Sequence, residues 1–204
     1  MMIKDLDAGV VRVWEGLRPT TKKMLVGILE TAGSSPANVQ PQIYGYDAHS
    51  DWELSRLLSA LDEHGKGKEA GAGGEAVQLA ETCAQILEAQ SGSAEVFIQL
   101  ATRAIKLHDY RKLDALADVL AERFAPGEIA EIVRQSELPQ IRAIAYETLS
   151  MLSLRSLVML MDDPLYSDIS ANAIEQQAYE YESEDARAFL EQLDEEADLG
   201  DPRN

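Results

Sequence analysis

The residues best suited to chemistry are Asp47, His49 and Asp51, which form the pattern Asp-x-His-x-Asp in a stretch without regular periodicity. Carboxylate oxygens and an imidazole nitrogen at this spacing are candidate ligands for a divalent metal ion. Asp51 equally suits the first turn of a helix, where the dipole favours negative charge, with Ser50 as the cap. We therefore keep a metal-binding or enzymatic site in the 44–52 loop as an alternative, and we expect no bound metal or cofactor.

Three large aromatic side chains flank the same loop: Tyr44, Tyr46 and Trp52. Amphipathic aromatic residues are enriched at binding hot spots, which makes these three our candidates for contact with a partner. Large aromatic side chains also supply burial wherever they lie. The alternative is therefore that they pin the loop onto the neighbouring helices.

The other reactive side chains favour structural roles. Cys83, the only cysteine, lies among apolar residues of an expected helix, so we expect a small core residue and no internal disulfide. His64 and His108 stand at expected helix ends, where a histidine complements the helix dipole. Glu184 and Asp185 begin an expected helix, where negative charge is locally favoured. We find no catalytic residues and expect a protein that is not an enzyme.

The charge balance excludes some classes of partner. The 204 residues include 18 basic and 36 acidic side chains, a net charge of -18. Nucleic acids and anionic membrane surfaces are bound by clustered Lys and Arg, so a basic protein partner fits better. No segment approaches the roughly 20 apolar residues of a membrane span, and residues 1–17 lack the apolar core of a signal peptide. The sequence predicts a cytoplasmic protein.

Apolar residues recur with helical spacing, and the strand-type alternation is nearly absent. Residues 1–64 are expected to contain a helical pair, in which Pro19 closes the first helix and Thr20 or Thr21 caps the second. An irregular loop, residues 33–50, follows this pair.

The remaining chain divides by composition. Ser50 and Glu53 stand in capping-box relation, so a further helix is expected to begin at Ser50. Residues 65–74, GKGKEAGAGG, have almost no side chain able to pack and are predicted to be a flexible linker. Short connections between helical segments in residues 75–195 predict antiparallel hairpins. Residues 196–204 are predicted to be an acidic disordered tail.

Three stretches of the C-terminal half, which begin at Ala101, Ile129 and Leu157, align at one constant spacing. Matching apolar positions alone are weak support for a repeat, because this spacing equals four heptads, at which any two amphipathic helices show matches by chance. Helix breaks coincide as well, and so does a column of small residues that predicts close approach between helices: Ala117, Ala145 and Ala173. We call this interval the repeat spacing. A fixed period of this length predicts stacked helical hairpins.

Two segments resemble the HEAT class of helical-hairpin repeats: Glu131–Leu149 and Leu157–Ile174. Each has an apolar first helix, an acidic turn with proline, and a second helix of apolar residues and alanine. Arg142 stands where such repeats often have a basic residue, and Ser170 takes that place in the second segment. The resemblance implies a protein-binding scaffold without catalytic residues. A tetratricopeptide array is the alternative, although its 34-residue period is not met.

We therefore expect an all-α fold of stacked antiparallel helical hairpins, a HEAT-like superhelix preceded by an N-terminal helical pair. The expected function is that of a non-enzymatic scaffold or adaptor that binds a protein or peptide, as a monomer or homodimer. A second alternative to this function is a structural protein that self-associates through its N-terminal helices, whose apolar stripes include Trp14 and Met24.

Overall fold

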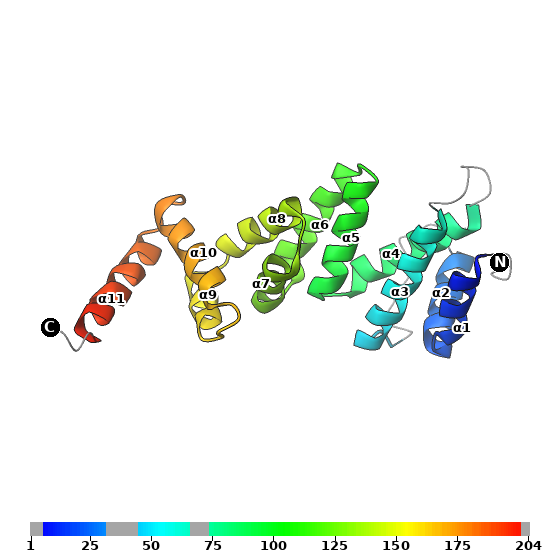
Figure 1. Ribbon diagram of the computed structural model, residues 1–204, viewed down its shortest axis with the longest axis horizontal. Coiled ribbons are helices and arrows are strands. Elements are labelled where there is room, and N and C mark those ends of the chain that lie inside the picture. Colours follow the sequence, from blue (N-terminus) through cyan, green and yellow to red (C-terminus); the bar gives the residue numbers. More distant parts are fainter. Residues whose placement is uncertain (1–5, 32–44, 66–73, 201–204) are drawn as a thin grey trace. The chain divides into compact units, whose positions relative to one another are not determined.

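The computed structural model describes residues 6–31, 45–65 and 74–200. These residues form eleven helices and no strand, so the predicted all-α fold is confirmed (Figure 1). The chain divides into two compact units, Met1–Ser91 and Gly92–Asn204.

Four helices make up the described part of the first unit: α1 (Ala8–Gly16), α2 (Pro19–Thr31), α3 (Ala48–Gly65) and α4 (Gly74–Gln90). The long helix α3 packs against the other three, and α4 also contacts α2. The core consists of apolar residues at helical spacing, including Leu54, Leu57, Leu58, Leu79, Cys83 and Leu87. Cys83 is buried and free of disulfides, as expected for a small core residue.

The start of α2 differs from the prediction. Pro19 is the first residue of α2, where its fixed φ and missing N–H suit the first turn. Thr21 is buried inside that turn and does not cap the helix.

The first unit ends later than the composition indicated. The predicted linker at 65–74 lies almost entirely outside the described residues, with Gly65 ending α3 and Gly74 beginning α4. The sequence pattern placed residues 75–90 with the repeat array, whereas α4 packs on α2 and α3 of the first unit. Sequence periodicity finds a helix but not its packing partner, which explains the difference.

The second unit contains seven helices among the residues described: α5 (Ala94–Lys106), α6 (Tyr110–Arg123), α7 (Pro126–Gln135), α8 (Pro139–Ser150), α9 (Leu154–Met161), α10 (Ser167–Tyr179) and α11 (Glu184–Gly200). Sequential helices pack as the hairpins α5–α6, α7–α8 and α9–α10. The first helices α5, α7 and α9 contact one another in order, and so do the second helices α6, α8 and α10. The three hairpins therefore form two layers, and α11 packs on α10 (Figure 1).

The α11 helix extends into the segment predicted to be a tail. It continues to Gly200, so the backbone of residues 196–200 is helical and not disordered. Residues 201–204 lie outside the described part of the chain. A solvated acidic helix end and an acidic tail have the same composition, so sequence composition does not separate them.

The repeat spacing is visible in the helix boundaries. The first helices α7 and α9 begin at Pro126 and Leu154, and the second helices α8 and α10 begin at Pro139 and Ser167. Both pairs of starts are separated by the interval that separates Ile129 from Leu157. The repeat spacing therefore moves each helix of the α7–α8 hairpin onto its counterpart in the α9–α10 hairpin.

Burial follows the same register. The three residues at which the aligned stretches begin are completely buried: Ala101, Ile129 and Leu157. In the small-residue column, Ala145 and Ala173 are completely buried and Ala117 is half-buried. Ala145 lies on α8, which contacts α6, α7 and α10, so a larger side chain there has little space.

In the described part of the chain, no single helix is long and apolar enough to cross a membrane. Two consecutive helices together have the length and apolar composition of a broken span, and they are inclined to each other by 113°: Pro139–Ser150 and Leu154–Met161. Ile141 and Leu157 of this pair are fully buried within the second unit.

We predict that Ala145→Leu lowers the free energy of unfolding by about 1–3 kcal/mol, because the added methylenes overpack a fully buried site. Ala143→Leu is the control, since Ala143 is exposed on the same helix. Urea unfolding followed by circular dichroism measures both. Equal stability of the two variants would show that the alanine column does not mark close packing.

Candidate functional site

The 44–52 loop, which was expected to hold a site, contains the cap of helix α3. Asp47 directly precedes α3, and its Oδ1 accepts bonds from the Ser50 N–H and from Ser50 Oγ, both at 2.8 Å. Ser50 Oγ in turn accepts the Asp47 N–H at 3.3 Å. The predicted cap at Ser50 is therefore wrong: α3 begins at Ala48, and Asp47 and Ser50 form the reciprocal cap between them.

Glu53, the predicted capping partner of Ser50, instead fastens α3 to the start of α2. Its side chain is 1% exposed. The Arg18 N–H donates to Glu53 Oε1 at 2.6 Å, and Arg18 Nε and the Thr21 hydroxyl donate to Oε2. Glu53 therefore supplies, from another helix, the acceptor that the first turn of α2 needs.

These bonds keep the buried carboxylate charged. Burial raises the pKa of Glu53, but the hydrogen bonds from Thr21 and Arg18 outweigh burial and hold the pKa below its usual value. Arg18 also donates two parallel bonds to Asp47, at 2.9 and 2.7 Å, which lower the pKa of that carboxyl. One guanidinium thus joins the cap of α3 to the start of α2.

The geometry does not bring the Asp-x-His-x-Asp residues together as ligands. Asp47 is bound by Arg18, and Asp51 accepts a hydrogen bond from the Tyr46 hydroxyl. His49 Nε2 lies 3.8 Å from Glu53 Oε1, on the exposed side of α3. No three His, Cys, Asp or Glu residues in the described ranges are placed to hold a metal ion.

The aromatic candidates have different surroundings. Tyr44 lies outside the described residues. Tyr46 donates its hydroxyl to Asp51, and burial followed by that bond raises the pKa of Tyr46. Trp52 is 53% exposed, with the Arg56 guanidinium 4.5 Å from its ring centroid and the His49 ring centroid at 5.4 Å. Tyr46 therefore bonds to the first turn of α3, and partner contact by Tyr46 and Trp52 stays a prediction.

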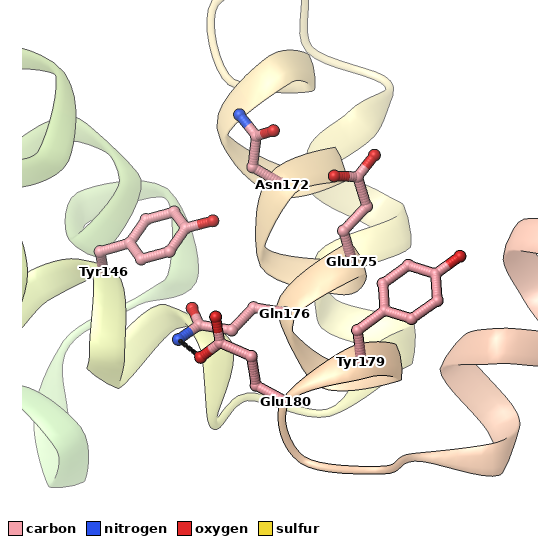
Figure 2. A pocket seen from close by; sticks show the side chains of 6 residues that line it. All are labelled: Tyr146, Asn172, Glu175, Gln176, Tyr179 and Glu180. Carbon is pink, nitrogen blue, oxygen red and sulfur yellow. Dashed lines mark hydrogen bonds between the residues drawn. The ribbon is translucent and has the colours of Figure 1, made fainter.

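A second candidate site, which the sequence reasoning missed, lies between α8 and α10 of the second unit. It is an open depression of about 330 Å³ (Figure 2). We call it the α8–α10 depression. Its lining combines two phenols, two carboxylates and two amides, from Tyr146, Asn172, Glu175, Gln176, Tyr179 and Glu180.

Hydrogen bonds at the end of α8 position this lining. The buried Gln177 of α10 donates from Nε2 to the carbonyls of Ser150 and Leu152, at 2.8 and 2.6 Å. Ser150 Oγ lies 2.7 Å from Gln176 Oε1, and Gln176 Nε2 donates to Glu180 Oε2 at 2.9 Å. The Glu180 carboxylate is therefore held through side chains of both helices.

The electrostatics of the depression are strongly negative. Burial, followed by the charges of Glu175 and Glu180, raises the pKa of Tyr146, so its hydroxyl remains protonated. Within the described part of the chain, neither Glu175 nor Glu180 has a basic side chain as a partner. Residues 139–200 contain 14 acidic and 3 basic residues. The depression thus offers unpaired negative charge beside aromatic rings.

One feature of the sequence could have revealed this position. Glu147 and Glu175 occupy equivalent places in successive repeats, and both are exposed on second helices. Glu147 accepts a bond from the Tyr181 hydroxyl at 2.9 Å, whereas Glu175 has no such partner among the described residues. The repeat register therefore indicated neighbouring surface carboxylates, but not which of them is free.

Comparison of the chain with protein-family models, with curated proteins and with solved structures gives no match. The all-helical architecture and the side chains of the two candidate sites therefore carry the functional argument by themselves.

We predict that Glu53→Gln lowers the free energy of unfolding of the first unit by about 1–3 kcal/mol at neutral pH, because charged hydrogen bonds are lost. Since the pKa of Glu53 is depressed in the folded state, its contribution is present above the unfolded pKa and is lost as the pH falls. The variant should therefore lose less stability on acidification than the unmodified protein does.

Tryptophan fluorescence during urea unfolding measures this effect, because both tryptophans, Trp14 and Trp52, lie in the first unit. Glu63→Gln is the matched control, since Glu63 is exposed on the same helix as Glu53. An unchanged acid dependence in Glu53→Gln would contradict the assigned role.

Proposed function

We propose that the chain is a non-enzymatic helical-repeat scaffold, HEAT-like in its second unit, that binds a basic segment of a cytoplasmic protein or peptide. The observation that carries this proposal is the α8–α10 depression. Unpaired carboxylates next to tyrosine rings, on the open surface of stacked second helices, suit recognition of a cationic chain.

The repeat supports the scaffold part of the proposal. Three hairpins in two layers, of which the last two have helix starts at the repeat spacing, are the arrangement in which each unit buries its apolar face on its neighbours. Ser170, which departs from the basic residue expected by resemblance, is fully buried and donates to the Leu157 carbonyl at 2.6 Å. A buried hydrogen bond between α9 and α10 therefore stands where the resemblance predicts a charged side chain on the surface.

The shape of the depression supports a macromolecular partner. Its volume of about 330 Å³ is at the lower end for small-molecule sites, which usually enclose most of the ligand. An open site of this size admits a side chain that projects from a protein surface. The net charge of -18 favours encounter with a positively charged partner.

The two alternative functions have less support from the described residues. Asp47, His49 and Asp51 each face a different neighbour, so a metal site in the loop lacks assembled ligands. Met24 is buried inside its own unit and Trp14 is half-buried, which reduces the apolar surface left for self-association.

The proposal predicts that a selection of random short peptides on the purified full chain enriches peptides rich in Lys and Arg. Their binding should weaken as salt is added, because the attraction is electrostatic. Hydrogen exchange with a selected peptide should show protection in α8 and α10. Enrichment of neutral or acidic peptides, or protection confined to Met1–Ser91, would contradict the proposal.

A further inference from the structure

We infer that the α8–α10 depression is a binding pocket for one arginine side chain of the partner. The inference rests on the proposed scaffold function and assigns the chemistry of its contact. The arrangement of acceptors and aromatic rings around the depression supports this assignment.

The acceptors come from one stripe of α10, and the phenol comes from α8. Asn172, Gln176 and Glu180 follow one another at intervals of four residues, so they lie along one face of the helix. Figure 2 shows the Tyr146 side chain extending from α8 toward this stripe. Glu175 also lines the depression and adds the second carboxylate, and in Figure 2 its side chain lies on the side of α10 away from Tyr146. A cation in the depression therefore has oxygen acceptors along α10 and a tyrosine on the side of α8.

The negative charge is available and partly preorganised. Glu180 is oriented by Gln176, whose own amide oxygen lies 2.7 Å from Ser150 Oγ. Glu175 and Glu180 are exposed, so pairing them with a cation does not require burial of an isolated charge. The entropic cost of binding therefore comes mainly from ordering the partner side chain, and less from ordering the site.

Arginine fits this set of groups better than lysine does. The guanidinium is planar, presents five N–H donors in a fixed fork and stacks on aromatic rings, whereas an ammonium is a compact and strongly hydrated point charge. The depression offers two carboxylates and two side-chain amides spread along more than one turn of α10. The guanidinium can place two of its donors on one of these carboxylates while its plane lies against a tyrosine ring, and an ammonium has no plane to stack.

The test is a titration of the ¹⁵N-labelled full chain with the peptide acetyl-Gly-Arg-Gly-amide, followed by NMR chemical shifts. Matched peptides carry lysine, or citrulline, which has the shape of arginine without its charge. The arginine peptide should shift residues of α8 and α10 around Tyr146 and Glu175, the lysine peptide less strongly, and the citrulline peptide not at all. Shifts elsewhere only, or equal shifts with citrulline, would overturn the inference.

A pair of double variants tests the carboxylates. Glu175→Gln with Glu180→Gln should weaken arginine-peptide binding about fivefold, as expected for exposed ion pairs. The control with the same change in net charge, Asp114→Asn with Asp118→Asn, alters exposed acids of α6 and should leave binding unchanged. Equal weakening in both double variants would mean general charge attraction and would overturn the pocket.

The outcomes separate this inference from the scaffold proposal. If selected basic peptides bind the second unit but bind Glu175→Gln with Glu180→Gln as tightly as the unmodified chain, the arginine pocket fails and the scaffold stands. If no peptide binds the second unit, the scaffold itself fails. Circular dichroism of each variant establishes that the fold is retained before binding is compared.

Discussion

Helix ends leave backbone groups without partners, and at two ends in this chain a buried polar side chain of another helix provides the partner. Glu53 of α3 accepts the Arg18 N–H at the start of α2. Gln177 of α10 donates to the carbonyls of Ser150 and Leu152 at the end of α8. Some helices are short, such as α9 with 8 residues, so most of their stability must come from packing and from such ends. These bonds therefore add directional contacts between α2 and α3 and between α8 and α10 to the packing of apolar surfaces.

The same bonds build the candidate site. Apolar packing between α8 and α10 brings the helices together but permits small rotations and shifts along their axes. Gln177 removes this freedom because its amide must reach two specific carbonyls. The adjacent Gln176 is thereby placed next to Ser150, and it holds Glu180 toward the depression. Gln177, which joins the two helices, and Gln176, which lines the candidate site, are thus consecutive residues of one helix that face different neighbours.

Periodicity predicted most of the helices and the register of the hairpins, because burial recurs at the repeat spacing, at positions such as Ile129 and Leu157. It did not predict the start of α3, since Asp47 and Ser50 are both good caps and the choice depends on Arg18, 29 residues away from Asp47. The depression was missed for a similar reason. Tyr146 and Glu180 belong to different hairpins, and only the contact between α8 and α10 brings them to one place.

The acidic residues of this chain differ in their surroundings: some are bound by basic or polar side chains, and others are not. Glu131 of α7 is bound by Arg134 and Gln135, and the hydrogen bond from Arg134 is the main reason that the pKa of Glu131 falls to about 2. Such a carboxylate contributes to the fold and has little attraction left for a partner. Glu175 has the same charge, but it has no basic partner among the described residues and borders a tyrosine-lined depression. Composition counts both alike, so it does not distinguish a carboxylate that is bound within the fold from one that is open to pairing.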